Sequence, residues 1–531
     1  MRNNWERRVI PKWRSSSVHA SLQDNLPLQR KDRKRSREFF ENFSEELQQR
    51  LAEWRRNPDF GGAADLLNFS HISAYKELLV EPAQYLSRGQ RKLSSQLSSI
   101  VKSVLGIDEY HPYGQKDFTN AEISRQKVLI EQNPRAAIPY VDIARLYVIN
   151  NQLNHANRAI FTAVALAPDN RYVLRSASRF YIHNGDADRA SHLLRRTART
   201  QEDPWLLASL IAIETIQGKS PTYFKRARAM LEGMRYDAVH LSELGAALAT
   251  LHLDSGHIKD ARRLFNRSLS NPNDNAVAQA VWAANEFSMN ISIAPEWLAN
   301  RYSSEAAYYT HEKSGNYSEA LKNAQAWFDD EPFSTRPLQA GAFAASILGK
   351  YEIAEDQIKQ ALVIDPSSID SKNNLAFSFM VRNRLSEAVV LLAEVHAAEI
   401  RNGGKPSGHT LANIGMLYYR MGDVDHGYKF YEKAVTALDN ARQSSSKKIA
   451  LAYWAQEAAF ANDHQLPEVV NRAMAALAQE DSVAAKIVLA RALKKEVPNE
   501  NNGSAYKSLV HWEHDKSKNI LIATRRLPFK N

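Results

Sequence analysis

The sequence predicts an all-α fold in which pairs of helices stack into a superhelical solenoid. Three observations lead to this expectation. The chain has 531 residues but only 20 Gly and 19 Pro, below the usual ~7% and ~5%, which favours helices over a turn-rich β fold. Alanines and prolines recur with a spacing of 34 residues, which is typical of a repeat architecture. Outside the C-terminal tail, no segment keeps the sustained alternation of a β-strand.

Composition excludes several classes of protein. The hydrophobic share of 44% and the charged share of 24% are ordinary for a globular protein. The absence of Cys removes disulfides, thiolate metal sites and cysteine nucleophiles. No apolar run approaches the ~18 residues of a membrane span, and the N-terminus lacks the apolar stretch of a secretory signal. These features favour a cytoplasmic protein of bacterial type, without contact to a membrane.

A basic arm and a helical region are expected ahead of the repeats. Residues 1–35 combine a serine run with a cluster of Lys and Arg, and are predicted to form a flexible arm. Residues 36–133 carry apolar stripes at helical spacing, one from Phe39 to Trp54 and another from Leu86 to Val104. We therefore expect a helical N-terminal region, whose last part, before Pro134, looks like a lone second helix of a repeat.

Two blocks of 34-residue units follow, at 134–274 and 301–436. In each unit, small residues at positions 8 and 20 allow two helices to approach, and large residues at positions 4, 7, 11 and 24 fill the space between them. A final Pro ends the second helix. The residues at position 20 are Ala156, Ala190, Ala227, Ala261, Ala320, Ala354, Ala388 and Gly427. This pattern resembles the tetratricopeptide repeat (TPR) family over about residues 137–436, and it implies two arrays of such repeats.

The segments around the arrays depart from the period. Ala261 and Ala320 are 59 residues apart, 25 more than one period. The extra residues, 275–300, are expected to form an irregular joint with one helix around Trp282 and a short piece after Pro295. After Thr436 the period fades, and residues 437–498 are predicted to form a helical cap that shields the apolar face of the last repeat. Residues 499–531 form a basic C-terminal tail.

The family resemblance implies a binding groove lined by the first helix of each unit, at positions 2, 5, 9 and 12. In relatives of this kind the groove holds a peptide. The early units supply cations with aromatic neighbours, Tyr172 and Trp205, and the later units supply aromatic and amide side chains. The candidate partner-binding residues are Arg145, Arg175, Arg179, Tyr302, Tyr309, Arg336, Gln339, Phe343, Asn373, Phe377, Met416 and Tyr419. Alternatively, the aromatic residues pack against N-terminal helices folded into the groove.

One carboxylate-binding variant of this groove is not expected. Some family members clamp a C-terminal carboxylate with Lys and Asn, and here Gln339 and Phe343 stand at those places.

The net charge of +10 is concentrated at the two ends of the chain. Residues 1–37 carry +8 and residues 515–531 carry +4, so the body is nearly neutral. Such clustering is typical of an arm that contacts an anionic partner. The candidate nucleic-acid-binding residues are Arg30, Lys31, Arg33, Lys34, Arg35 and Arg37. Trp5 and Trp13, interleaved with Arg, would add stacking, although a solvated tail that aids solubility remains an alternative.

No catalytic, metal-binding or cofactor-binding motif is recognised. Gly349-Lys350 lacks the spacing of a phosphate loop, and His511 and His514 form only a pair at helical spacing, which without further ligands does not predict a metal site. We therefore expect a non-enzymatic scaffold or adaptor that holds a protein or peptide partner in its groove and has no small-molecule substrate. The alternative is a nucleic-acid-associated subunit whose arm contacts phosphate while the solenoid recruits an effector.

Overall fold

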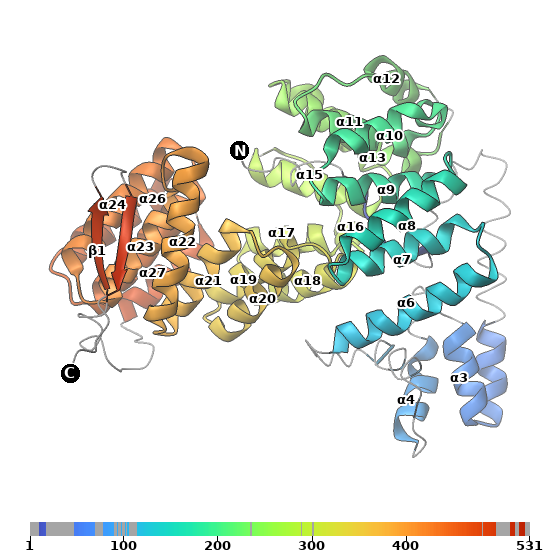
Figure 1. The fold of residues 1–531 in the computed structure, drawn as a ribbon, viewed down its shortest axis with the longest axis horizontal. Coiled ribbons are helices and arrows are strands. Elements are labelled where there is room, and N and C mark those ends of the chain that lie inside the picture. Colours follow the sequence, from blue (N-terminus) through green and yellow to red (C-terminus); the bar gives the residue numbers. More distant parts are fainter. Residues whose placement is uncertain are drawn as a thin grey trace. The chain divides into compact units, whose positions relative to one another are not determined.

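The computed structural model of the chain is a helical solenoid. The structure describes residues 10–16, 47–69, 78–89, 93, 97, 101, 104–105, 114–233, 236–287, 289–299, 302–479, 482–494, 510–515 and 520–525. The described chain is almost entirely helical, as the sequence predicts (Figure 1). It divides into two compact units, Met1–Trp297 and Leu298–Asn531. The division falls inside the segment 275–300, where the sequence predicts a joint.

The first unit contains four regular helix pairs and additional helices on both sides of them. Residues 47–56 are helical, and α3 (Phe60–Phe69), α4 (Val80–Arg88) and α6 (Gly114–Gln132) follow. The pairs are α7 (Ala137–Ile149) with α8 (Leu153–Leu166), α9 (Arg171–His183) with α10 (Ala187–Arg196), α11 (Pro204–Ile216) with α12 (Phe224–Glu232), and α13 (Ala238–Asp254) with α14 (Ile258–Ser268). A short 3-10 helix, η4 (Ala198–Gln201), precedes α11, and α15 (Asp274–Glu286) and α16 (Pro295–Leu298) follow the pairs.

The neighbours of the first array complete its stack. Helix α6 packs on α7, as expected of a lone second helix of a repeat, and α15 packs on α13 in the place of another first helix. Figure 1 shows α7, α8, α9 and α10 running side by side. The predicted joint at 275–300 therefore contains a further groove helix, α15, because its apolar face has a neighbour to cover.

The second unit continues the same architecture. Its pairs are α17 (Ser304–Ser314) with α18 (Tyr317–Asp330), α19 (Arg336–Ile347) with α20 (Tyr351–Ile364), α21 (Ile369–Val381) with α22 (Leu385–Gly403), α23 (Gly408–Arg420) with α24 (Val424–Asn440), and α25 (Ser444–Phe460) with α26 (Leu466–Gln479). Helix α27 (Val483–Lys494) packs along α25 and reaches α19. The segment 437–498 thus adds one more helix pair and a final helix.

Small residues hold the helices of each pair together. The alanines at position 20 are each no more than 1% exposed: Ala156, Ala190, Ala227, Ala261, Ala320, Ala354 and Ala388. In the last regular pair this role falls to Gly427, where an added Cβ would lie 2.6 Å from Tyr419. Helices α23 and α24 therefore approach more closely than an alanine would allow.

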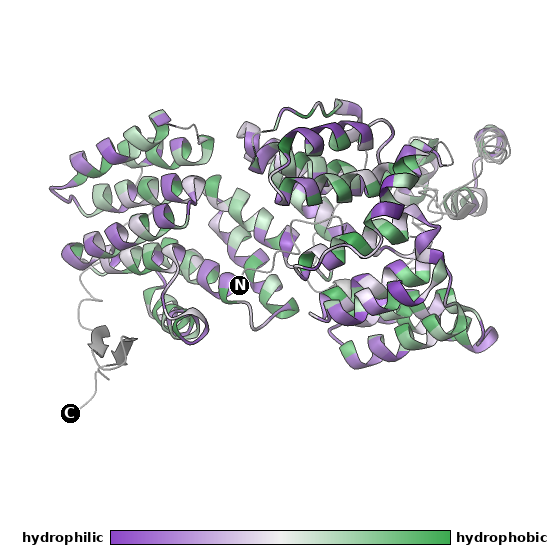
Figure 2. Cartoon of the chain, turned by 90° about the horizontal axis from the view of Figure 1, so that it is seen from above, coloured by the Kyte–Doolittle hydropathy of each residue, from purple (hydrophilic) through white to green (hydrophobic). Residues whose placement is uncertain are grey.

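Local signals explain where many helices begin and end. Asn170, Asp186 and Asn316 cap α9, α10 and α18, because each side chain accepts a hydrogen bond from a backbone amide of the first turn. Helix α17 ends at Ser314 and is followed by Gly315, whose φ of 79° is the left-handed conformation that favours glycine. Figure 2 shows hydrophobic and hydrophilic faces alternating around the helices, which is the pattern that buries one side of each.

A β-hairpin occupies part of the C-terminal tail. Strands β1 (Val510–Asp515) and β2 (Ile520–Arg525) pair antiparallel, with Val510 opposite Arg525, and β2 lies against α22. His511 and His514 both fall on β1. The helical spacing that a metal pair would have needed is therefore not present.

Candidate binding sites in the two arrays

A stretch of the N-terminal arm lies in the groove of the first array. Residues 10–16 contact α7, α9 and α15, which are all groove-lining first helices. Trp13 is completely buried and meets Phe180 edge-on, with ring centroids 6.1 Å apart. Lys12 and Arg14 are only 6% and 3% exposed. The prediction of a flexible arm is therefore wrong for these seven residues, because the apolar Trp13 and the groove carboxylates give them a binding site within the chain.

Side chains of the groove form hydrogen bonds with the backbone of residues 10–16. Asn275 Nδ2 donates to the carbonyl of Ile10 at 2.9 Å, and Arg145 Nε donates to the carbonyl of Trp13 at 2.9 Å. The Tyr172 hydroxyl donates to the carbonyl of Arg14 at 3.0 Å. Three backbone acceptors of an extended stretch are thus satisfied by side chains from three different helices, which is how peptide-binding grooves hold a ligand.

Two carboxylates in this groove contact the same stretch. Asp274 forms an ion pair with Arg14, with Nη2 and Oδ2 2.7 Å apart. Asp142 accepts from the backbone amide of Ser16 at 2.8 Å and from the Ser16 hydroxyl. The Tyr172 hydroxyl is also 2.7 Å from Asp142, so its one proton is shared between this carboxylate and the carbonyl of Arg14. Burial, and next the charge of Asp142, raises the pKa of Tyr172 well above its usual value. The hydroxyl therefore stays protonated and works as a donor.

The predicted cationic strip of the first array does not present free charge. Arg175 binds Glu243 through both guanidinium arms at 2.7 and 2.9 Å and lies 5.1 Å from the centre of the Trp205 ring. Arg145 is engaged with the Trp13 carbonyl, and Arg179 is 3% exposed. The expectation that these cations face an external partner is corrected: in this structure Arg145 binds the chain's own residues 10–16, Arg175 is in an ion pair and Arg179 is buried.

The groove of the second array contains an open pocket. Its volume is about 310 Å³, and it lies among α19, α21, α23 and α25. Five predicted residues line it: Gln339, Phe343, Asn373, Phe377 and Met416. They stand at positions 5 and 9 of their repeats, so the structure brings these two positions of three helices together at one pocket.

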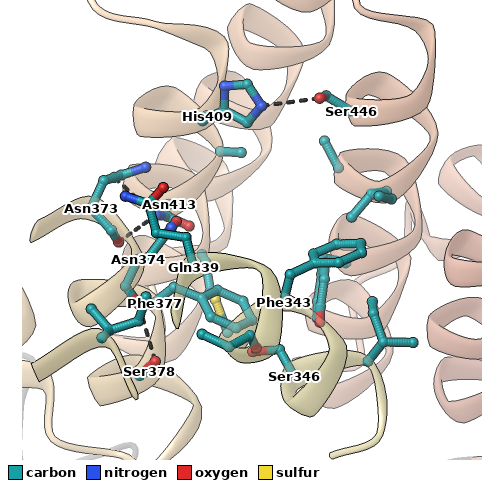
Figure 3. A pocket seen from close by; sticks show the side chains of 18 of the residues that line it. Gln339, Phe343, Ser346, Asn373, Asn374, Phe377, Ser378, His409, Asn413 and Ser446 are labelled. Carbon is teal, nitrogen blue, oxygen red and sulfur yellow. Dashed lines mark hydrogen bonds between the residues drawn. The ribbon is translucent and has the colours of Figure 1, made fainter. Parts of the chain in front are cut away.

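Amide groups gather on one side of the pocket. Figure 3 shows Gln339, Asn373, Asn374 and Asn413 on this side, and the hydrogen bond between His409 and Ser446 at one end. Asn413 Nδ2 donates to both the carbonyl and the Oδ1 of Asn373, at 3.0 and 2.9 Å. Each carboxamide has two donor and two acceptor positions, so this wall offers further hydrogen bonds to a bound molecule.

Aromatic rings form another part of the lining. Phe377 meets Tyr453 edge-on at 5.1 Å, and Phe343 meets Tyr317 edge-on at 6.1 Å. The Tyr453 hydroxyl is buried and has no hydrogen-bond partner among the described residues. Burial raises the pKa of Tyr453, so the hydroxyl keeps its proton. The lining residues that the structure identifies include no Asp, Glu, Lys or Arg.

Several pocket residues were not foreseen from the sequence. Tyr453, Ser446 and Ile449 come from α25, which lies after Thr436, where the period fades. His409 and Asn413 lie on α23, a recognised repeat helix, but at positions 2 and 6. Position 2 is one of the groove positions, so His409 could have been found by applying the rule to this unit.

Four predicted residues of the second array lie outside the pocket. Tyr419 is 4% exposed and belongs to the core, where its hydroxyl donates to Asp463 at 2.7 Å. Arg336 pairs with Glu305 at 2.7 Å, and Tyr309 packs against Tyr308 with ring centroids 5.1 Å apart. Tyr302 is half-buried next to α17. Tyr419 is buried because α25 continues the stack and covers position 12 of the preceding repeat.

The basic cluster of the arm lies outside the described residues. This holds for Arg30, Lys31, Arg33, Lys34, Arg35 and Arg37, and for Trp5. Trp13 is described, and its burial in the first groove removes it from stacking on a nucleic acid in this structure. Among the described residues, no helix has both the length and the apolar character needed to cross a bilayer.

The comparisons agree with the repeat pattern. Residues 408–437, which form α23 and most of α24, match the family described as tetratricopeptide repeat. The match covers this one unit, and the 34-residue period and the stacked helix pairs extend the same repeat pattern along the chain. No curated protein matches the sequence.

The solved structures that are similar to this chain are distant in sequence. The human IFIT1 dimer with m7Gppp-AAAA is 11% identical, with 74% of this chain and 94% of that chain covered and a TM-score of 0.31. Yeast Tom70 is 14% identical, with 72% and 96% covered and a TM-score of 0.30. A tetratricopeptide repeat protein from Parabacteroides merdae is 15% identical, with 50% and 91% covered and a TM-score of 0.24.

Proposed function

We propose that this protein is a non-enzymatic scaffold that holds an uncharged, partly apolar segment of a partner protein in the pocket of the second array. The observation that carries the proposal is the pocket itself, of about 310 Å³, open within the groove and lined by aromatic rings and amides. Pockets of this size and lining are typical of binding sites. An extended segment fits this groove because amides can pair with its backbone while the rings take its side chains.

The lining argues against a charged occupant. Transferring a charge out of water is costly unless an opposite charge or several hydrogen bonds receive it. The identified lining of the pocket contains no Asp, Glu, Lys or Arg. The groove of the first array differs in this respect, since Asp142 and Asp274 there contact a basic segment. The two arrays therefore select different segments.

A displayed library of random peptides tests this proposal. Panning on the full chain should enrich uncharged peptides with an aromatic residue. Changing both Phe343→Ala and Phe377→Ala should weaken their binding at least tenfold, because both rings line the pocket. The matched control is Phe161→Ala, since Phe161 lies on α8 of the other unit and is 64% exposed. Enrichment of charged peptides, or equal binding by the double variant, would contradict the proposal.

Charge favours a second candidate function, contact of the arm with nucleic acid. Six basic residues and only one acid fall within residues 30–37. A Lys/Arg arm binds phosphate with little sequence preference, and each contact releases counterions. The slope of log affinity against log salt should then be about −0.7 to −0.9 per contact.

The structure changes how this second candidate should be tested. Deleting the whole arm would also remove residues 10–16, which fill the first groove. Replacing the six basic residues of 30–37 with Gln leaves that stretch in place. Binding to single-stranded or duplex probes at low salt should then fall at least tenfold. Unchanged affinity would assign the basic cluster to another role.

A further inference from the structure

We propose that the groove of the first array is a binding site for extended basic segments with a Trp–Arg pair, and that residues 10–16 are a built-in competitor for this site. A partner segment of the same chemistry binds by displacing them. The proposal concerns the first array only and does not depend on the pocket of the second array.

The groove recognises its occupant as a peptide. Residues 10–15 form neither helix nor strand, and three of the backbone carbonyls in 10–16 accept hydrogen bonds from Asn275, Arg145 and Tyr172. Trp13 is the anchor, completely buried against Phe180. A buried aromatic anchor with backbone hydrogen bonds around it is the arrangement that carries most of the binding energy in peptide recognition.

Specificity for a basic residue after the Trp comes from Asp274. Its carboxylate is 2.7 Å from Arg14, and the two side chains are 10% and 4% exposed. A partly desolvated carboxylate favours a cation and rejects an acid at this place. Asp142 adds a preference for a small residue with a hydrogen-bond donor at the position two residues after Arg14. Ser16 occupies this position, and both its backbone amide and its hydroxyl donate to Asp142.

The polar wall of the groove is organised by contacts within the array. Glu243 on α13 accepts from Arg175 and from the Nδ2 groups of Asn273 and Asn275. These bonds hold Asn275 in place whether or not the Ile10 carbonyl is present. When residues 10–16 leave, water enters and solvates Asp142 and Asp274. The site is therefore pre-formed, which lowers the cost of exchanging one ligand for another.

The covalent connection makes the internal segment a strong competitor. Residue 16 is followed by thirty residues before the next described one, residue 47. A ligand on the same chain acts at an effective concentration on the order of millimolar. A free peptide must overcome this competition, so weakening the internal segment should increase the affinity for an external copy.

A labelled peptide that copies residues 8–18 tests the proposal by fluorescence anisotropy. It should bind the full chain weakly and the full chain with Trp13→Ala at least tenfold more tightly. The same peptide with Ala in place of Trp13 or of Arg14 should lose binding. Adding Asp274→Asn to the Trp13→Ala chain should weaken binding at least fivefold, whereas adding Asp260→Asn, on α14 and 48% exposed, should not.

Two further variants complete the test. A chain lacking residues 1–16 should bind the peptide as tightly as the Trp13→Ala chain. Adding Phe343→Ala and Phe377→Ala to the Trp13→Ala chain should leave its affinity for the peptide unchanged. Absence of binding to both opened chains would overturn the proposal. So would loss of the folded state by both opened chains in circular dichroism, because a displaceable segment leaves a folded groove behind.

Discussion

Tyr453 places a buried hydroxyl, which has no hydrogen-bond partner in the described part of the chain, in the lining of the second-array pocket. A buried polar group left unpaired costs about 1–3 kcal/mol. We predict that Tyr453→Phe will keep or raise the melting temperature, because no hydrogen bond is lost. Peptides selected on the pocket should bind this variant up to about tenfold more weakly, which is the worth of one hydrogen bond. A lower melting temperature would show that the hydroxyl is bonded in the folded chain.

Glu312 is the side chain from which we expect a pH effect on stability. Burial raises its pKa to about 7, while an unfolded Glu titrates near ~4.3. The folded state therefore binds the proton more tightly, and stability falls as the pH rises between these two values. Glu312→Gln should raise the free energy of unfolding at pH 8 by about 1–3 kcal/mol and have little effect at pH 4.

The control for this prediction is Glu319→Gln. A hydrogen bond from Lys322 lowers the pKa of Glu319, so any effect should have the opposite sign. Denaturant unfolding at both pH values measures the two variants. Equal effects of Glu312→Gln at pH 4 and pH 8 would contradict the assignment.

Individual pocket residues were predictable where the position in the repeat alone determines which way a side chain points. Positions 5 and 9 place Gln339, Phe343 and Phe377 at the pocket. Tyr419, at position 12, could not be placed correctly, because its surroundings depend on α25, whose sequence no longer shows the period. The ion pair of Arg175 with Glu243 could not be predicted from the sequence either, since the two residues are 68 positions apart along the chain.

At the scale of elements, close contact between paired helices should tolerate no added side chain. A Cβ added at Gly427 would lie 2.6 Å from the ring of Tyr419. This ring is held, because the hydroxyl of Tyr419 donates to Asp463 and accepts from Trp454. We predict that Gly427→Ala will destabilise the protein by about 1–3 kcal/mol, as overpacking does.

A second glycine provides the control for this substitution. Gly403, at the end of α22, has no atom within 4 Å of an added Cβ. Gly403→Ala should leave the melting temperature unchanged or raise it slightly, since Ala reduces the entropy of the unfolded chain. Equal melting temperatures for Gly427→Ala and the parent chain would mean that α23 and α24 can move apart freely.

The helix pairs were the elements that the sequence predicted best, because their period repeats several times. The docked stretch 10–16 could not be predicted in the same way. It is too short to show a period, and its partner Asp274 is 260 residues away in sequence. Its composition suggested a solvated arm, and only the folded groove shows that Trp13 and Arg14 have a site of their own. The contact of the hairpin β1–β2 with α22 was hidden for a similar reason, since the two segments are distant in sequence.

For the whole molecule, the division into two units has a thermodynamic consequence. Stacked repeats contact mainly their neighbours, so stability adds up along an array and a local defect spreads only through adjoining pairs. The chain divides between Trp297 and Leu298, and each side has a separate buried cluster, one including Leu244 and Phe265 and the other including Trp327 and Trp454. We therefore expect each unit to open as a separate cooperative body.

Two matched substitutions test this expectation. Leu210 on α11 and Leu392 on α22 are both completely buried, and Leu→Ala at such sites costs about 2–5 kcal/mol. In hydrogen exchange read by mass spectrometry, Leu210→Ala should speed exchange in α7–α15 and leave α17–α25 unchanged. Leu392→Ala should do the reverse. If either variant speeds exchange over both units to the same extent, the two arrays unfold as one body, and a ligand in one groove would then stabilise the other.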